Sequence, residues 1–498
     1  KRMMPRSAIK LSARQRVTAA VKGLSAAFSG YWEGGDKSRY RNRPNQRLVA
    51  QDTDLDLGTR ESMLSEARSL AQTFPIIRRI LKTYSTYCVG NLRVQWSTGV
   101  PEIDRQYEAA WINSMQTLDA KGQHHFTKLA KIALTRMLCD GDVFAQKIDS
   151  KGVGQIAIIE GDRVTSAIGG SVGFDTDTLI GGVNVNANGK PLSYRVCRRN
   201  GTGSFVDPVN IGTADMLHLW DTDRADSYRG VTAFASVLNS MRDLKEILHA
   251  ETVGVKTASK MGLIINSLSG GIASSGGEVE LFTNNSTTQS ASTQVNAQEI
   301  TDGVIQYMFP GEEIKAFMSD RPSAAWQGFV AWLVELVSIG LDLPKSVVWS
   351  MSGLGGAAAR FEIQTAGRTF ASTQDILERK FLVPVAAWTT AKLINSGRLP
   401  FHPNWYQFAF QRPPFVSVDL GRDSKAGIEE NKAGMLTAQE WFAESGQDFY
   451  EQTEQLAKEA KYRADVAAQY GVSTADIRQT TPNGNAPTQA EPVMAQPA

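Results

Sequence analysis

Cysteine and histidine are scarce in this chain of 498 residues. The three cysteines, Cys88, Cys139 and Cys197, stand far apart and form no CxxC pair, which argues against a disulfide framework. With no secretory leader pattern ahead of them, they indicate synthesis in a reducing, cytoplasmic compartment. No histidine pairs with cysteine or carboxylate at zinc-ligand spacing, so we expect packing or surface roles for all of them. The histidines are His124, His125, His218, His249 and His402.

A strong net charge and a long apolar run are also missing. The formal net charge is only +2, so any nucleic-acid contact must be local. The most apolar stretch, residues 329–343, carries Glu335 and Asp342 and is shorter than the roughly 20 residues that cross a bilayer. We therefore expect no membrane span. Hydrophobic residues make up 42% of the chain and charged residues 21%, which is typical of a globular protein with two or three compact units.

Motifs typical of enzymes are weak. Residues 169–173 match the nucleophile elbow with Ser171 at its centre, but the turn-like residues 174–178 follow where that motif requires a helix. The pairs Asp140/Asp142 and Asp221/Asp223 could bind a metal in principle, although capping of turns is the expected role of aspartate at such places. A hydrolase or DNA-processing enzyme that uses Ser171 or an aspartate cluster remains the alternative function.

Residues 52–56 alternate aspartate with other residues, as a calcium-binding loop does. The glycine that such a loop needs at its sixth position is Leu57 here, and the closing glutamate at its twelfth position is Met63. An acidic turn that caps a helix is therefore the favoured interpretation. We predict no metal site, no cofactor and no catalytic residue.

The first 90 residues combine a basic segment with a helix pair. Twelve Lys or Arg and two acids lie among residues 1–50, and the densest part, residues 37–47, contains helix-disfavouring Asn and Pro. This segment is either an arm that contacts phosphate or acidic protein, or a solvated tail; its densest cations are Arg39, Arg41, Arg43 and Arg47. Helical spacing then begins near a partial cap at Thr59, is interrupted by Pro75, and resumes until Gly90, which suits a left-handed C-cap.

Helical and β-like patterns follow in blocks, so the fold class is α+β. Two helices are indicated around 111–118 and 126–138, and five short β-like runs between 142 and 220 predict a small antiparallel sheet. A long helix is predicted from about 231 to 260, followed by a polar, exposed insertion over 267–300 and a strand at 304–309.

The second half begins with a very apolar helix, predicted to place five residues on one face: Trp326, Phe329, Val330, Leu333 and Val337. Apolar residues on its other flank predict packing on more than one side. Residues 344–359 are rich in glycine and alanine and predict a flexible loop without a core pattern. A long helix kinked at Pro384 should span 360–395, helices return from 425, and the last eighteen residues read as a disordered tail.

Short landmarks in a fixed order resemble the lambda-type family of tailed-bacteriophage portal proteins over roughly residues 59–420. They are Ala67-Arg-Ser-Leu70 with Pro75 and Cys88-Val-Gly90, Leu138-Cys-Asp-Gly-Asp-Val-Phe144, Ile159-Glu-Gly-Asp-Arg163, Met216-Leu-His-Leu219 with Arg224 and Arg229-Gly-Val231, Pro310-Gly-Glu312 and Gly340-Leu-Asp-Leu-Pro344. One departure stands out: the family's Tyr-Ser-Ser-x-Arg step reads Gly356-Ala-Ala-Ala-Arg360 here, which puts the local loop conformation in doubt.

The resemblance implies a portal fold that forms a ring, commonly of twelve copies, around a DNA channel. Its expected parts are a basic N-terminal arm (1–58), a mixed wing (59–235), stem helix one (236–262), a small clip with the polar insertion (263–322), stem helix two (323–343), a tunnel loop (344–359), a long kinked helix returning to the wing (360–424), a helical crown (425–480) and a disordered tail (481–498). The tunnel-loop residues expected at the channel are Lys345, Ser350, Ser352, Gly353, Gly355, Gly356 and Arg360.

The same resemblance implies a structural, non-enzymatic role at one capsid vertex of a virion assembled in the host cytoplasm. The expected partners are other copies of the chain, sequence-independent double-stranded DNA, the major capsid protein or a scaffold, the terminase large subunit and a head-tail adaptor. The helix that is apolar on several flanks fits this role, because neighbouring subunits of a closed ring can cover its outer side. Another ring-forming head-tail adaptor is a further alternative.

Overall fold

The computed structural model describes residues 51–150, 153–166, 178–222, 224–266, 297–300, 303–308, 324–351, 355–413, 420–444, 447 and 449–472. Contacts divide the chain into residues 1–54 and residues 55–498. In the first unit the short helix α2 (Gln51–Asp54) is described. The Ser171 elbow, the arm arginines and the C-terminal tail predicted from the sequence lie outside the described residues.

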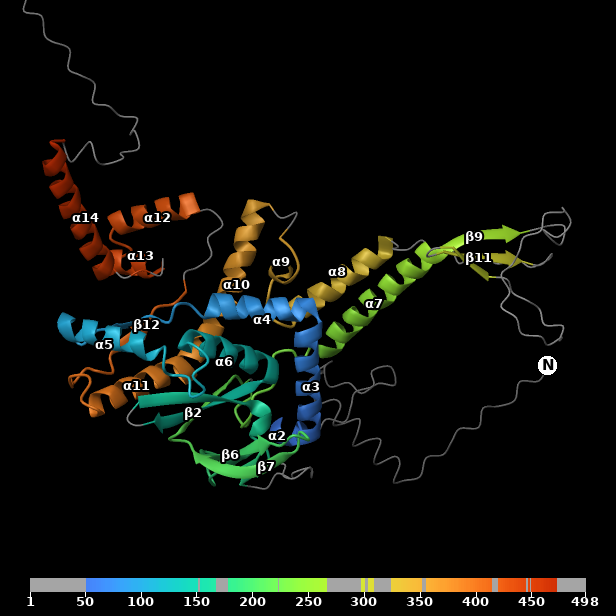
Figure 1. The fold of residues 1–498 in the computed structure, drawn as a ribbon, viewed down its shortest axis with the longest axis horizontal. Coiled ribbons are helices and arrows are strands. Elements are labelled where there is room, and N and C mark those ends of the chain that lie inside the picture. The colour runs from blue at the N-terminus through green and yellow to red at the C-terminus, as the bar shows by residue number, and fades with distance from the viewer. Residues whose placement is uncertain are drawn as a thin grey trace, which may run out of the picture. The chain divides into compact units, whose positions relative to one another are not determined.

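Four helices precede the sheets (Figure 1): α3 (Leu57–Thr73), α4 (Pro75–Cys88), α5 (Pro101–Ser114) and α6 (Phe126–Asp140). Pro75 opens α4, where its missing N–H costs nothing, so the predicted break is confirmed. The predicted cap at Thr59 is wrong: Asp56 caps α3 by accepting the Thr59 N–H at 3.3 Å. Gly90 does not take the left-handed conformation, which Leu92 adopts instead at φ 54°.

The β-like runs form two antiparallel sheets rather than the single sheet that the sequence predicts. The first has the order β3-β2-β8, with β2 (Asp142–Ser150) between β3 (Val153–Glu160) and β8 (Met216–Trp220). The second has the order β4-β5-β6-β7 and contains β4 (Leu179–Ile180), β5 (Val183–Val185), β6 (Pro191–Arg199) and β7 (Phe205–Gly212). Strand β7 was not predicted, because Pro208 and several polar residues conceal its alternation.

The long helix α7 (Leu238–Lys260) packs beside α8 (Ala324–Ile339), as Figure 1 shows. Between them lie β9 (Met261–Asn266), β10 (Ala297–Ile300) and β11 (Gly303–Met308), and β11 confirms the strand predicted there. Helix α7 begins at Leu238, after turns over residues 233–237, and so starts later than predicted.

The segment predicted as a flexible loop starts with structure. Residues 345–348 form the short helix α9 (Lys345–Val348), in which Ser346, Val347 and Val348 are buried. Helix α10 (Gly356–Leu377) begins four residues before the predicted start. The predicted kink is a π-helical turn, η4 (Glu378–Leu382), followed by α11 (Val383–Asn395) with Pro384 in its first turn.

The C-terminal part returns to the first helices before it leaves them. Strand β12 (Phe408–Phe410) pairs antiparallel with β1 (Val94–Trp96), a pairing that the sequence did not predict. Helices α12 (Leu420–Lys432), α13 (Ala438–Glu444) and α14 (Phe449–Tyr470) follow, as predicted in type. Arg93 and Arg105 form ion pairs with Glu451 and Glu454 of α14.

The main core lies where α3, α4, α6, α10 and α11 meet the β3-β2-β8 sheet, and it includes the buried rings of Trp111, Phe126 and Phe381. A smaller core between the two sheets gathers around Phe144. Among the described residues, no helix has both the length and the apolarity that crossing a membrane would require.

Candidate functional site: a buried charge network and an apolar stem

The centre of the site is an ion pair between two residues that are far apart in the sequence. Asp142, the first residue of β2, is fully buried, and Arg229 is 2% exposed. The Arg229 Nε donates to Asp142 Oδ2 at 2.5 Å, and its Nη2 donates to Oδ1 at 3.1 Å. The remaining Arg229 N–H groups donate to the carbonyl oxygens of Gly161, Val164 and Gly181. This guanidinium therefore ties β2 to two turns of the wing.

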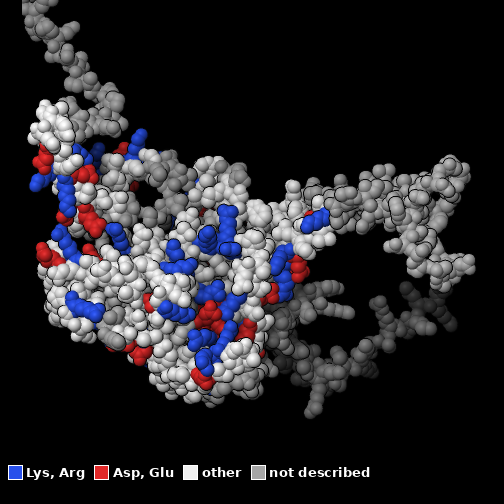
Figure 2. Space-filling view, viewed as in Figure 1, with Lys and Arg blue, Asp and Glu red and all other residues white. Residues whose placement is uncertain are grey.

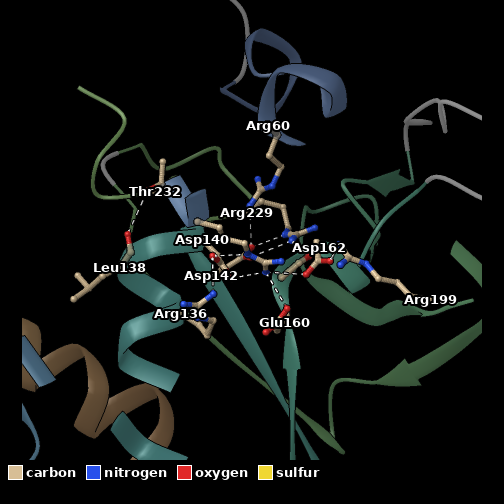
Figure 3. Close-up of polar contacts among 12 residues, drawn as sticks. Arg60, Arg136, Leu138, Asp140, Asp142, Glu160, Asp162, Arg199, Arg229 and Thr232 are labelled. Carbon is tan, nitrogen blue, oxygen red and sulfur yellow. Dashed lines mark hydrogen bonds and ion pairs between the residues drawn. The ribbon is translucent and has the colours of Figure 1, made fainter. Parts of the chain in front are cut away.

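Charged side chains from four further elements surround this pair (Figure 3). Arg60 of α3 reaches Asp142 Oδ2 at 3.1 Å and donates to the Gly230 carbonyl oxygen at 2.7 Å. Arg68, also on α3, donates to both Asp140 oxygens at 3.0 and 2.6 Å and to Asp162 Oδ1 at 3.0 Å. We call the whole set the charge network: Arg60, Arg68, Arg136, Asp140, Asp142, Glu160, Asp162, Arg199 and Arg229.

The pKa values show that this network holds its charges firmly. Burial of the Asp142 carboxyl alone would raise its pKa, but Arg229 and Arg60 lower that pKa well below the ordinary value. Burial likewise opposes the charge of Arg68, yet Asp140 raises the pKa of the guanidinium. Burial lowers the pKa of the neighbouring His218 to about 4, so this imidazole is neutral at pH 7. Its Nε2 lies 3.5 Å from Asp142 Oδ2.

Three glycines let the backbone segments of the network approach one another. A Cβ on Gly161 would lie 2.2 Å from Asp142 Oδ1, and a Cβ on Gly230 would lie 2.0 Å from the Gly141 carbonyl oxygen. Gly141 has φ 91°, and a Cβ there would lie 2.5 Å from the Val231 carbonyl carbon. The sequence landmarks around residues 138–144, 159–163 and 229–231 therefore share one physical cause, which is the assembly of this network.

The network is suited to holding elements together rather than to catalysis. Each of its carboxylates lies in an ion pair with arginine, and the described residues contain no group of histidine, cysteine and carboxylate side chains that could hold a metal ion. The predicted turn-capping role of Asp140 and Asp142 is thus wrong, because their partners are arginines. Sequence reasoning missed Arg60, Arg68 and Arg199, and only Arg229 stood in a landmark that it had singled out.

The second feature of the site is the apolar surface of α8. Val330, Leu333, Val334 and Val337 are buried, which agrees with three of the five residues predicted for one face. Phe329 departs from that prediction, since its side chain is 46% exposed. It belongs to an outer row at helical spacing, which we call the stem stripe: Phe329, Trp332, Leu336 and Ile339. Trp332 and Ile339 are 55% and 65% exposed.

The predicted channel residues adjoin a basic helix. Lys345 lies 3.8 Å from Glu335, while Ser350, Gly355 and Gly356 are exposed and Ser352 and Gly353 lie outside the described residues. The Arg79 side chain of α4 donates to the Trp349 carbonyl oxygen at 3.0 Å and so anchors the start of this segment. Helix α4 has no acidic residue, and Figure 2 shows basic side chains over it. We call its exposed cations, Arg78, Arg79 and Lys82, the α4 patch.

The family model for phage portal proteins of the lambda family matches residues 38–374, which include the charge network, α4, α7 and α8. The chain belongs to this family. The portal function predicted from the ordered landmarks is thereby confirmed, and it makes the chain a structural component of a phage-like particle.

Solved structures similar to this portal chain come from gene transfer agent particles. A chain of the virion of a native particle matches at a TM-score of 0.39 and 12% identity, covering 78% of the portal chain and 93% of its own length. A chain from the neck of an empty particle, computed with C6 symmetry, matches at a TM-score of 0.40 and 14% identity, with 77% and 94% covered. No curated protein matches the portal chain.

Proposed function

We propose that the chain acts as one subunit of a closed portal ring that conducts double-stranded DNA, and that the stem stripe is the surface on which neighbouring subunits meet. The exposure of Phe329, Trp332, Leu336 and Ile339 in a single chain is the observation that carries this proposal. Four large apolar side chains in one row cost free energy in water, and a neighbour that covers them recovers roughly 25 cal/mol for each Å² buried.

The counterpart of the stripe is the outer side of the neighbour's α7. Val253 and Val255 on that helix are 48% and 38% exposed. Because α7 and α8 pack side by side within one chain, each subunit offers a donor face and an acceptor face on different sides of the pair. Such a head-to-tail interface closes into a ring when the rotation between subunits divides a full turn, and rings of twelve copies are common for portal proteins.

The channel contact is assigned to the segment 344–359 and the adjoining α4 patch. The exposed Gly355 and Gly356 supply backbone without bulky side chains, and Arg78, Arg79 and Lys82 supply a local positive charge in a nearly neutral chain. A few cations contact phosphate without reading sequence, and too few of them are present to trap the duplex by counterion release.

The remaining partners follow from the same role. The basic arm with Arg39, Arg41, Arg43 and Arg47 would contact capsid protein, scaffold or DNA. The part between α7 and α8 would form the clip that meets the terminase and later a head-tail adaptor, and α12 to α14 would form the crown. An exclusively structural role is part of this proposal, because the charge network uses its carboxylates in ion pairs.

Replacing Trp332 by Arg tests the ring interface directly. A cation in the middle of the stem stripe should prevent assembly, so size-exclusion chromatography with light scattering should find a subunit where the unchanged chain forms a ring. The matched control is Tyr462→Arg on α14, where a 70% exposed ring lies away from α8. Electron microscopy of normal rings from the Trp332→Arg chain would disprove the assigned interface.

A further inference from the structure

A cavity of about 470 Å³ lies beside the charge network and takes no part in it. Strand β8 supplies one wall, the β5–β6 hairpin and Tyr194 supply another, and residues 225–228 and η4 complete the lining. The volume is in the range of pockets that hold small ligands or the end of a peptide, roughly 300–1,000 Å³. It is therefore large enough for a molecule of several heavy atoms rather than for a few waters.

Aromatic ring edges form much of the wall. The His218 imidazole lies between Phe144, with ring centroids 4.3 Å apart at 16°, and Trp220, with centroids 5.1 Å apart at 12°. Both faces of the imidazole are covered by these parallel rings, so His218 contributes an edge to the cavity. Ring edges carry partial positive charge, and they attract anions more than cations.

One cation and no carboxylate lie among the twelve described residues that line the cavity. The cation is Lys380, which the π-helical turn η4 carries to the mouth of β8. Its Nζ donates to the Trp220 carbonyl oxygen at 2.8 Å and lies 4.6 Å from the centre of the Trp220 ring. One hydrogen bond leaves two further N–H donors on this ammonium. Asp221 is exposed at the next position and attracts the ammonium from outside the lining.

The π-helical turn is a second sign that the place is built for a purpose. Such turns have poorer backbone hydrogen bonds than an α-helix, and they occur frequently at functional sites. Here the turn interrupts an otherwise continuous run from α10 to α11, at the point where Lys380 meets Trp220. The packing of Phe381 and Leu382 into the core fixes the turn on its inner side.

We propose that this cavity is a carboxylate-binding site, in which Lys380 holds the anionic group and the edges of Trp220, His218 and Tyr194 surround an apolar or aromatic remainder. The carboxylate belongs either to a free small acid or to the C-terminal end of another chain. The site is independent of the ring interface, since it uses no residue of α7 or α8.

Isothermal titration of the assembled chain with N-acetylphenylalanine, a monocarboxylate with one ring, tests the site. The uncharged N-acetylphenylalaninamide is the matched ligand control. Lys380→Gln, which removes the charge and keeps most of the stem, should weaken binding of the acid about tenfold or more. Lys392→Gln is the matched protein control, because Lys392 on α11 pairs with Asp149 outside the cavity.

A second variant guards against a folding defect in Lys380→Gln. Ala225 is exposed at the rim of the cavity, so Ala225→Phe should fill the space and abolish binding while the thermal midpoint stays unchanged. A hexapeptide ending in phenylalanine with a free carboxylate separates the two sources. Binding as tight as that of the small acid assigns a chain end, and exclusion of the peptide assigns a free acid.

Three results would overturn the proposal. The acid and its amide could bind equally, the Lys380→Gln chain could bind as tightly as the unchanged one, or the acid could show no heat of binding up to about 10 mM, where even millimolar affinity would be detected. Failure of ring assembly in the Trp332→Arg chain leaves all three readings intact, because that variant retains the cavity.

Discussion

The charge network and the stem stripe solve opposite problems. In the network, four carboxylates and five arginines lie in or at the edge of the wing, and their partners all come from the same chain. In the stem, α8 buries one face on its own chain and leaves Phe329, Trp332, Leu336 and Ile339 exposed. The wing is thus complete as a single chain, whereas the stem is complete only when another molecule covers the stripe.

This difference assigns separate tasks to the two regions. A subunit that must hold its shape before assembly needs interactions that do not wait for a partner, and the Asp142–Arg229 pair meets that need. A subunit that must recognise its copies needs a surface that is unfavourable alone. The stem and the wing should therefore respond differently to substitutions, with losses of folding in one and losses of assembly in the other.

The largest effect is expected from Asp142→Asn. The substitution keeps the shape of the side chain but leaves the buried Arg229 guanidinium without its counter-charge, which should lower the free energy of unfolding by about 3–5 kcal/mol. Urea unfolding followed by circular dichroism, at one fixed protein concentration, measures this loss. The matched control is Asp207→Asn in the exposed pair with Arg198, where little change is expected. Equal midpoints for both variants would contradict a structural role for the network.

A smaller effect should appear with pH through His218. Its pKa falls from 6.5 to about 4 on folding, so the unfolded chain binds the proton more readily between these values. Stability should therefore be complete above pH 6.5 and decline toward pH 4, by on the order of 3 kcal/mol. Asp142 contributes at still lower pH, because its pKa is already below the ordinary range.

Unfolding of the unchanged chain and of His218→Gln at pH 7 and at pH 5 tests this window. The variant should lose less stability between the two values than the unchanged chain does. His249→Gln is the control, since His249 is exposed on α7. A decline in the His218→Gln chain as steep as in the unchanged one would assign the pH dependence to other groups.

Local patterns in the sequence predicted most helices, the strands of β2, β3, β6 and β8, and the break at Pro75. They could not predict the network, because Arg60 and Asp142 are 82 positions apart and Arg60 and Gly230 are 170 apart. Short landmarks with glycine were visible, but their shared cause is a contact in space. Similarly, Val347 and Val348 are buried although the glycines around them favoured a loop.

The stem shows what periodicity can and cannot decide. Apolar residues on both flanks of α8 correctly predicted contacts on more than one side. Which residues face the chain itself depends on the angle at which α7 lies, and this angle moved Phe329 from the predicted inner face to the exposed row. The cavity at Lys380 was beyond prediction, since η4 and β8 meet only in the folded wing.

The smallest expected effect concerns the α4 patch and sharpens the contrast between folding, assembly and DNA contact. Arg78→Gln combined with Lys82→Gln should leave stability and ring formation unchanged, because both side chains are exposed and belong to neither the network nor the stripe. If the patch contacts phosphate, removing two cations should lower the dependence of duplex binding on salt concentration by about two in the log–log slope. Fluorescence anisotropy with a short duplex between about 50 and 200 mM salt measures this slope. Lys190→Gln in the β5–β6 hairpin provides an exposed control, and an identical slope in all three chains would place the DNA contact elsewhere in the ring.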